Sequence, residues 1–351
     1  MTRLDKYFKF KPGSISEPNI YLGTKLKKMT LENGVECWAS SPSKYVEEAV
    51  RNVEKYLKDL DSDRWKLPKR AENPFAMACE PELDTSPELS PDLASFYMSE
   101  IGVLRWMVEI GRIDIGTEVS MLSSHMAMPR EGHLDAMLHV FAHVKQKHNS
   151  RLALDPTYPL IDEPKFVKYD WTEQYNGAKE PVPANMPRAL GKEVDLRLYV
   201  DSDHAGEKLT RRSRSGWLIY MQCALIAFHS KRQSTVETSV FGAEFCAMKT
   251  GIEALRGIRY KLRMMGIPLT GPSFVYGDNM SVIHNTQRPE STLKKKNCSV
   301  AYHFIREAVA MDECRTCHIR TEDNPADLLT KVLFGSKRRR LVRKILYDIY
   351  D

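Results

Sequence analysis

The carboxyl-terminal half of this 351-residue chain predicts an α/β fold. Three observations predict it: segments that alternate between apolar and polar side chains, a long segment with the spacing of an amphipathic helix, and Gly and Pro residues that separate these segments. The expected order is strand, strand, strand, helix, strand, helix, strand, helix. The residues that come before this part predict a mainly helical region.

The first strand is expected at residues 196–201, where apolar and polar side chains alternate. Two further strands are expected at residues 217–221 and 225–229, with the Ser215-Gly216 pair as a turn signal before them. From about residue 239 the apolar residues recur at intervals typical of a helix, so a long amphipathic helix is expected there.

Two strands and a helix complete the predicted domain. The fourth strand is expected at residues 273–276, directly after the Gly271-Pro272 pair. A fifth strand is expected around residues 316–320, and Pro325 is expected to open a helix after it, since Pro suits the first position of a helix.

Four acidic residues lie at the ends of these elements: Asp201, Glu244, Asp278 and Asp327. Carboxylates from separate elements can hold two metal ions about 4 Å apart, which is how many enzymes cleave phosphodiesters. Mg²⁺ suits such a site because it prefers hard oxygen ligands. Each acid alone is better explained as a cap of a turn or helix. The ordered set of four predicts a two-metal site.

Short motifs surround these acids in a fixed order: Asp201-Ser202-Asp203-His204-Ala205-Gly206, Arg211 to Gly216, Ser230 to Gln233, Ala243-Glu244-Phe245, Gly277-Asp278-Asn279, Tyr302 to Glu307, and Asn324 to Lys331. Together they resemble the ribonuclease H domain at the end of copia-type retrotransposon Pol polyproteins. The resemblance implies a ribonuclease H-like mixed five-stranded sheet with helices. It also implies that the four acids are catalytic and bind two Mg²⁺ ions, for which Mn²⁺ can substitute.

The resemblance implies a function as well, namely an endonuclease that hydrolyses the RNA strand of an RNA/DNA hybrid. In this hypothesis Glu244 bridges a metal and the 2′-hydroxyl side of the substrate, and Asp327 is the outermost ligand. The chain departs from the family pattern at His204, at Gly242 and at residues 297–299. These departures motivate an alternative, a catalytically inactive nucleic-acid-binding remnant or an accessory subunit of a retroelement polymerase.

A weaker resemblance extends toward the amino terminus. Residues 1–80 are similar to the end of the palm and the thumb of a reverse transcriptase, and residues 92–154 to its helical connection. A Pro-rich linker at 155–192, the ribonuclease H-like domain at 193–334 and a basic tail at 335–351 are expected to follow. The chain has no Asp-Asp pair, so it lacks the Tyr-x-Asp-Asp turn of a polymerase. It is therefore not expected to synthesise DNA alone, and the polymerase portion of a Pol polyprotein is an expected partner.

Basic residues gather around the acidic centre. The residues expected to bind nucleic acid are Arg211, Arg212, Arg214, Lys231, Arg232, Asn279, Lys294, Lys295 and Lys296. One basic cluster is more often a solvated surface, but three clusters that flank an acidic centre favour phosphate binding. An RNA/DNA hybrid would be recognised by its backbone and its 2′-hydroxyls. The basic tail either contacts nucleic acid, acts as a nuclear signal, or packs a stripe containing Leu341, Ile345 and Leu346.

Three other patterns have a functional and a structural interpretation. Cys314 and Cys317, followed by His318, match a haem or zinc pattern, but no second Cys pair has zinc spacing and neighbouring strand residues face opposite sides. His318 has the spacing of a mobile catalytic His, although a structural role is favoured. His139 and His143 share a helix face without a third acidic ligand, so a structural role is favoured there too.

Composition limits the class of protein. Hydrophobic residues make up 42% of the chain, the net charge is +6, and seven cysteines are scattered along it. No apolar run approaches the length of roughly 18 residues that a membrane span needs, and no signal peptide is evident. An odd number of scattered cysteines is typical of reduced thiols. A cytoplasmic or nuclear protein that is neither secreted nor membrane-bound is expected.

Overall fold

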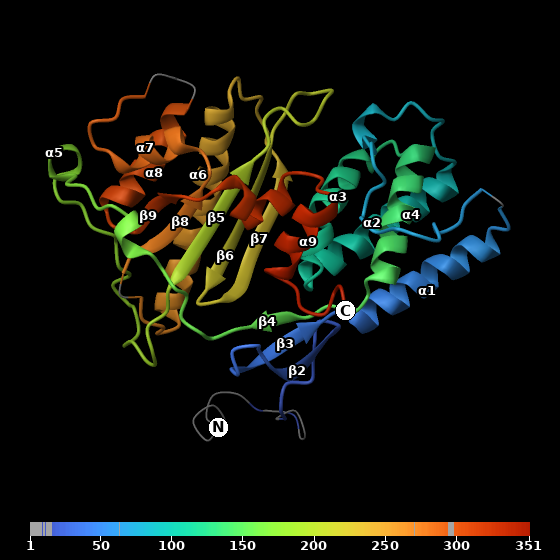
Figure 1. Ribbon diagram of the computed structural model, residues 1–351, viewed down its shortest axis with the longest axis horizontal. Helices are drawn as coiled ribbons and strands as arrows, with labels where there is room; N and C mark the ends of the chain where they lie inside the picture. The colour runs from blue at the N-terminus through green and yellow to red at the C-terminus, as the bar shows by residue number, and fades with distance from the viewer. Residues whose placement is uncertain (1–8, 10, 12–15, 63, 270, 294–297) are drawn as a thin grey trace.

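The computed structural model describes residues 9, 11, 16–62, 64–269, 271–293 and 298–351. The chain forms a four-stranded sheet near its amino terminus and a five-stranded sheet in its carboxyl-terminal half. Figure 1 shows the five-stranded sheet with its helices on the left, a group of helices on the right and the small sheet below. No helix in the described ranges is both long enough and apolar enough to cross a lipid bilayer.

The five-stranded sheet is mixed and has the strand order β7-β6-β5-β8-β9. Its strands are β5 (Leu196–Ser202), β6 (Arg214–Met221), β7 (Ala224–Arg232), β8 (Ser273–Gly277) and β9 (Cys314–His318). The first three strands run antiparallel, β8 runs parallel to β5, and β9 runs parallel to β8. Three antiparallel strands followed by two parallel ones form the predicted ribonuclease H-like sheet, so the predicted fold class is confirmed.

Helices cover this sheet in the order α6 (Val240–Met264), α7 (Met280–Gln287) and α8 (Ser299–Ala310). Ser239 caps α6, because its Oγ accepts a hydrogen bond from the backbone N–H of Gly242. The helix packs closely on β5, where a Cβ at Gly251 would lie 3.0 Å from Val200 Cγ1. The predicted start of the long helix is therefore confirmed. Between β8 and β9 the described residues form two α-helices, α7 and α8, where one was expected.

Several predicted positions differ from the structure. β6 begins three residues earlier than expected, and β7 ends three residues later. β9 begins and ends two residues earlier than expected. The Ser215-Gly216 pair lies inside β6, opposite Ser202 and Asp201, and not in a turn. Gly216 is needed there for a different reason: a Cβ at this position would lie 2.7 Å from Thr330 Cγ2 and 2.8 Å from Leu329 Cβ. The absent side chain lets the segment after Pro325 pack onto the sheet.

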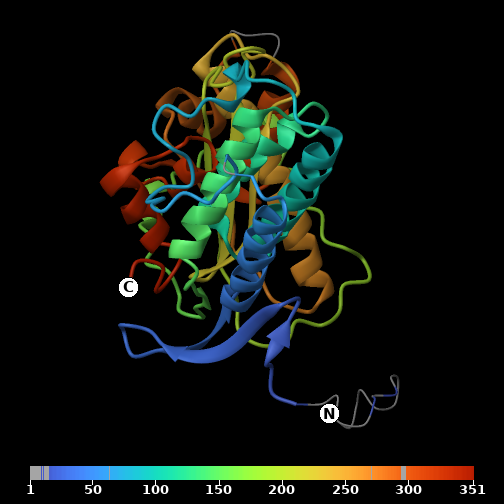
Figure 2. The same ribbon diagram turned by 90° about the vertical axis from the view of Figure 1, so that its right-hand side faces the viewer.

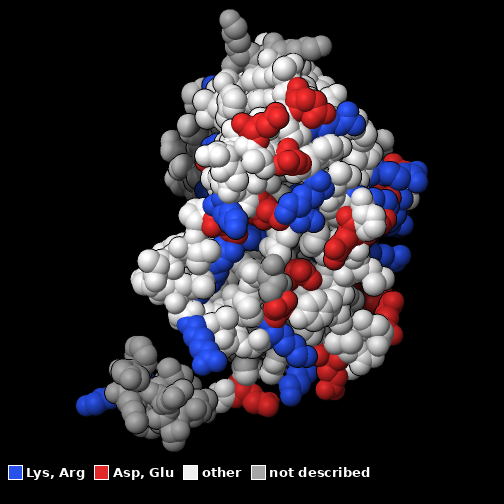
Figure 3. Space-filling view, turned by 90° about the vertical axis from the view of Figure 1, so that its left-hand side faces the viewer, with Lys and Arg blue, Asp and Glu red and all other residues white. Residues whose placement is uncertain are grey.

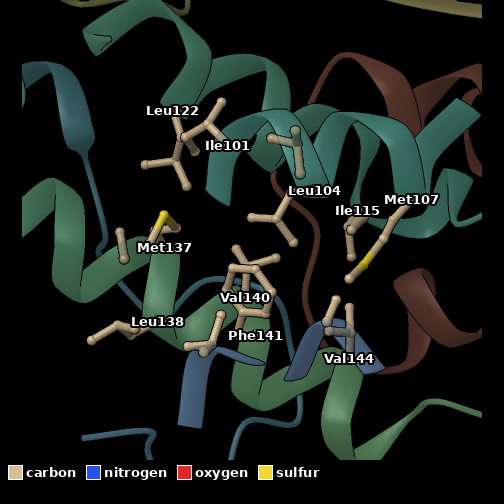
Figure 4. Packing of buried hydrophobic residues seen from close by; sticks show 14 of the residues in the cluster. Ile101, Leu104, Met107, Ile115, Leu122, Met137, Leu138, Val140, Phe141 and Val144 are labelled. Carbon is tan, nitrogen blue, oxygen red and sulfur yellow. The ribbon is translucent and has the colours of Figure 1, made fainter. Parts of the chain in front are cut away.

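The helices on the right of Figure 1 enclose a separate hydrophobic core. They are α1 (Ser43–Asp59), α2 (Pro91–Glu109), α3 (Gly116–Leu122) and α4 (Glu131–Gln146). Figure 4 shows Leu104, Phe141 and their neighbours pointing into the space between α2, α3 and α4. Ser90 caps α2, and Pro91 occupies its first turn. The stripe of apolar residues on α4 is thus part of this core.

The small sheet joins the two ends of this helical region. Its antiparallel strands are β1 (Ile20–Tyr21), β2 (Thr24–Thr30), β3 (Glu36–Ser41) and β4 (Leu152–Leu154). Figure 2 shows the β2–β3 ribbon at the foot of α1. The remaining short elements are η1 (Pro81–Leu83), η2 (Ile113–Ile115), η3 (Ser123–His125), η4 (Glu163–Lys165), α5 (Thr172–Tyr175), η6 (Thr321–Asp323) and η7 (Pro325–Leu329).

The carboxyl-terminal segment packs between the two halves of the molecule. It begins with α9 (Gly335–Arg343), which lies between the five-stranded sheet and the helical region in Figure 1. Its buried residues form a cluster with side chains of β6, β7 and η2: Leu341, Val342, Ile345, Leu346 and Ile349 contact Ile113, Leu218, Tyr220 and Leu225. Of the three interpretations of the basic tail, the packed apolar stripe matches the structure.

Arg338 of α9 reaches a buried group of charges in the helical region. Its Nη2 donates to the backbone carbonyl of Asp114 at 2.5 Å, and its Nη1 lies 3.4 Å from Glu118 Oε1. Asp114 also accepts two hydrogen bonds from Arg112. Burial alone would raise the pKa of Asp114, but the guanidinium of Arg112 holds it far below its ordinary value. These side chains are all at most 2% exposed.

We expect Arg338→Met to lower the free energy of unfolding by about 3–5 kcal/mol, because it leaves Glu118 buried without its cationic partner. Urea unfolding measures this change. Arg339→Met is the matched control, since Arg339 is exposed and pairs only at 3.8 Å with Glu72. Equal stability of the two variants would show that the buried contact of Arg338 contributes nothing.

Candidate metal centre

Three of the four predicted acids converge at one end of the sheet. Asp201 lies near the carboxyl end of β5, Asp278 directly follows β8, and Glu244 lies in the first turns of α6. Each offers a carboxylate oxygen, and these oxygens all lie within 4.8 Å of one another. β5 and β8 are parallel neighbours, so their carboxyl ends meet at the same edge of the sheet. No other His, Cys, Asp or Glu group among the described residues brings three ligand atoms so close.

The three acids differ in their exposure to solvent. Asp201 and Glu244 are buried, whereas Asp278 is half-buried and forms the accessible side of the group. Asp278 Oδ2 accepts a hydrogen bond of 2.9 Å from Thr321 Oγ1. The carboxylate of Glu244 accepts a hydrogen bond from the backbone of Ser202. A ligand from solvent therefore reaches this group past Asp278.

Burial and like charges act together on the two inner acids. Burial, together with the carboxylates of Asp327 and Asp278, raises the pKa of Asp201 to about 7, although Lys331 opposes this rise. Burial, with Asp201 and Asp278 nearby, also raises the pKa of Glu244 well above its ordinary value. A divalent cation would relieve this repulsion, and three converging carboxylate oxygens are suitable ligands for it. The residues present thus fit a divalent ion.

Asp327 lies beside this group but is not part of it. It is fully buried in η7, and its Oδ1 lies 2.5 Å from Lys331 Nζ. The ammonium of Lys337 pairs with Oδ2 of the same carboxylate. Lys331 Nζ also lies 3.2 Å from Asp201 Oδ2. The structure therefore places Asp327 next to Asp201, with an ammonium group between them.

Polar contacts fix η7 on the sheet. Asn324 Nδ2 donates to the backbone carbonyl of Val200 at 2.8 Å, while its Oδ1 accepts from the N–H of Ala326. Thr330 Oγ1 donates to the carboxylate of Asp201. The predicted helix at Pro325 is in fact this short 3₁₀ helix. It still delivers Asp327 to the end of the sheet.

Sequence reasoning assigned no role to four residues that contact these acids: Thr321, Thr330, Lys331 and Lys337. Lys331 could have been identified, because it follows Asp327 by four residues, a spacing at which side chains meet on a helical surface. Thr321, Thr330 and Lys337 gave no such signal, since their contacts depend on how separate segments pack.

The predicted nucleic-acid-binding residues lie in different environments. Arg211 and Lys231 are exposed, and Arg212 and Arg232 are half-buried. Arg214 is buried, and its Nη1 donates to Ser120 Oγ of α3 at 2.6 Å, so an internal contact already occupies it. Asn279 is the cap of α7, because its Oδ1 accepts from the N–H groups of Ser281 and Val282. Lys294, Lys295 and Lys296 lie outside the described residues.

A cleft of about 650 Å³ is lined by residues of β7, α2 and α3. Its basic lining residues are Arg105, Arg212, Lys231 and Arg232, and the serines of α3, η3 and β7 supply hydroxyl groups. A smaller hollow of about 280 Å³ shares Arg212 and Arg232 with this cleft and is also lined by Asp203 and Lys331. Arg232 of β7 therefore borders both hollows, and the smaller one is lined by Thr330 and Lys331, which contact Asp201.

The other Cys and His patterns lie in different surroundings. Cys314 is buried in the core beneath α6, while Cys317 packs with Phe166 and Phe274 on another side. His318 is exposed beside Gly277, the residue before Asp278. His143 is buried, and its Nδ1 forms a 2.9 Å hydrogen bond with the backbone carbonyl of Ala71.

We expect the metal-free protein to lose stability as the pH rises from about 4 to about 7. Over this range the folded state keeps protons on Asp201 and Glu244 that the unfolded chain has released, because their pKa values are raised on folding. Melting temperatures in a chelator at about pH 5 and about pH 8 measure the effect. Asp201→Asn should reduce the decline and half-exposed Asp323→Asn should not; an unchanged decline in Asp201→Asn would contradict this origin.

Comparison with known proteins identifies relatives of this sequence. No protein-family model matches the chain. It is 28% identical over 249 residues to a retrovirus-related Pol polyprotein from transposon RE1 of Arabidopsis thaliana, covering 71% of this chain and 15% of the polyprotein. It is 26% identical over 242 residues to the corresponding polyprotein from transposon TNT 1-94 of Nicotiana tabacum, covering 69% of this chain and 15% of that protein.

Among solved structures, LC11-RNase H1 in complex with an RNA/DNA hybrid is 18% identical, with a TM-score of 0.32 over 39% of this chain and 94% of that one.

The chain spans about 15% of the length of the two polyproteins that it matches. The motifs, the sheet order and these sequence matches agree. The chain is a relative of the retrovirus-related Pol polyproteins of transposons and contains a ribonuclease H-like fold.

Proposed function

We propose that the chain is a Mg²⁺-dependent endonuclease that hydrolyses the RNA strand of RNA/DNA hybrids. The observation that carries this proposal is the convergence of Asp201, Glu244 and Asp278 within 4.8 Å, from three separate elements. Two buried acids and one accessible acid at the end of a ribonuclease H-like sheet form a site that is costly to fold without a cation.

Each acid has a distinct part in the proposed site. When bound, two Mg²⁺ ions would activate a water and stabilise the leaving oxygen of the phosphodiester, and Mn²⁺ would substitute for them. Asp201 would be a ligand of both ions, since it lies close to Glu244 on one side and to Lys331 and Asp327 on the other. Asp278 is the acid nearest to solvent and so to the substrate. Asp327 would be the fourth ligand.

The cleft beside β7 supports nucleic acid as the substrate. Arg105, Arg212, Lys231 and Arg232 line it, and its hydroxyl groups suit a sugar-phosphate backbone. Such contacts fix the position of a strand without reading its bases, and 2′-hydroxyls then distinguish RNA from DNA. By contrast, Figure 3 shows basic and acidic side chains interspersed on the face at the left of Figure 1.

The matched polyproteins suggest the context of this activity. Because the chain spans about 15% of them, the remaining polymerase portion of such a polyprotein is a proposed partner. One observation favours the second candidate, an inactive nucleic-acid-binding remnant or accessory subunit. Both oxygens of Asp327 are paired with ammonium groups, so of the four acids only Asp201, Glu244 and Asp278 offer oxygens to a cation, and Lys331 also contacts Asp201.

We expect the purified chain to cleave the RNA strand of a labelled RNA/DNA hybrid when Mg²⁺ is present. Asp278→Asn should reduce the rate at least about a hundredfold, because a lost metal ligand removes several kcal/mol of transition-state stabilisation. Gel separation of the end-labelled RNA strand measures cleavage.

Two comparisons make this experiment specific. Asp323→Asn is the matched control, since Asp323 is half-exposed and pairs with Lys344 away from the three acids. Duplex RNA should stay intact. Binding of the hybrid without any cleavage by the unaltered chain would favour the remnant or accessory subunit.

We expect a variant carrying Lys231→Ala and Arg232→Ala to bind the hybrid more weakly, with a smaller dependence on salt. Each phosphate contact that is lost should lower the slope of log affinity against log salt by about 1. Fluorescence anisotropy at several salt concentrations measures both changes. A variant carrying Lys165→Ala and Lys168→Ala is the control, because these exposed lysines pair with Asp162 and Asp312 outside the cleft. Equal slopes in the two variants would exclude the cleft as the binding surface.

A further inference from the structure

Lys331 connects two buried carboxylates of the candidate metal centre. Its Nζ lies 2.5 Å from Asp327 Oδ1 and 3.2 Å from Asp201 Oδ2. The Lys337 ammonium pairs with the other oxygen of Asp327. The protein itself therefore supplies a cationic partner for each side-chain oxygen of Asp327.

The opposite side of Asp201 is different. There Asp201 approaches Glu244 and Asp278, and no Lys or Arg among the described residues forms an ion pair with either of these two acids. The centre thus has one side where carboxylates face one another and one side where an ammonium separates them. Asp201 belongs to both sides.

This asymmetry affects how cations bind. An ion on the side of Glu244 and Asp278 gains the attraction of three carboxylates and displaces no cation of the protein. An ion shared by Asp201 and Asp327 has to compete with the Lys331 ammonium for the same oxygens. A divalent ion at this second place must also overcome the repulsion of the charge on Lys331.

The place of Lys331 is set by the fold around it. Its neighbour Thr330 donates to Asp201, and Leu329 packs against Gly216 of β6, where no side chain keeps the two segments apart. Lys331 also follows Asp327 by four residues, so both side chains leave the same short segment. These contacts place the Lys331 ammonium between the two acids.

We propose that the Lys331 ammonium occupies the position at which a second cation would bind. The chain binds one divalent ion at Asp201, Glu244 and Asp278, and it binds another between Asp201 and Asp327 only when the Lys331 ammonium moves away. Lys331 is then a positioning residue that sets the affinity for the second ion. This inference rests on the proposed function, because it presupposes a divalent ion at the three acids.

Titration of the full chain with Mn²⁺ tests the proposal, with bound ions counted by calorimetry and free Mn²⁺ followed by electron paramagnetic resonance. The unaltered chain should bind one ion tightly and a second one weakly. Lys331→Met should tighten the second ion by at least about tenfold, because the competing charge is gone. Lys331→Arg keeps the charge and should bind as the unaltered chain does.

Two further variants separate the possible results. Lys344→Met removes an ammonium of the same carboxyl-terminal segment that contacts Asp323 instead, and should leave both affinities unchanged. Lys331→Gln replaces Lys331→Met if urea unfolding shows that the Met variant is not folded. If the uncharged variant still binds the first ion but its affinity for the second ion is unchanged or lower, this proposal is wrong. The proposed function is not affected by that result. If Asp278→Asn does not weaken the first ion, the proposed function fails and this inference fails with it.

Discussion

Arg338 is buried between the helical region and the five-stranded sheet, where its guanidinium contacts Glu118 and the backbone of Asp114. A buried guanidinium is tolerated only where its partners are fixed, so the helical region and α9 must keep one relative position. Lys337, the preceding residue in the chain, pairs with Asp327 at the end of the sheet. Two consecutive residues of one helix thus connect a buried charge group in one half of the molecule to the candidate metal centre in the other.

The candidate centre places like charges together at a cost in stability. Asp201 and Glu244 are buried next to each other and to Asp278, which raises their pKa values. Nothing in the packing of the sheet requires acids at these positions, because apolar side chains of the same strands form the core nearby. Residues that oppose folding and converge from separate elements are typical of sites kept for function. Lys331 offsets part of this cost without closing the side that faces solvent.

Much of the fold could be predicted from local patterns, and the centre only in part. The alternation of apolar and polar residues predicted β5, and the helical spacing of apolar residues after Ser239 predicted α6. Both signals lie within the segment that they predict. Gly216 was misread as a turn residue, since the reason for a glycine there is a contact with Leu329, more than a hundred residues away. Likewise, the sequence could not show that Arg214 is buried against Ser120 or that Lys331 reaches Asp201. Such contacts depend on packing between distant segments.

The contact between Ser120 and β7 has a consequence for how this protein can be divided. β7 is an edge strand of its sheet, and Ser120 Oγ of α3 donates to the backbone carbonyl of Ser230 at 3.0 Å. Outermost strands with unpaired backbone groups tend to join strands of other molecules. A ribonuclease H-like fragment cut away from α3 would expose this strand. Its self-association would then reflect an uncovered sheet edge, and not a failure of the sheet to fold.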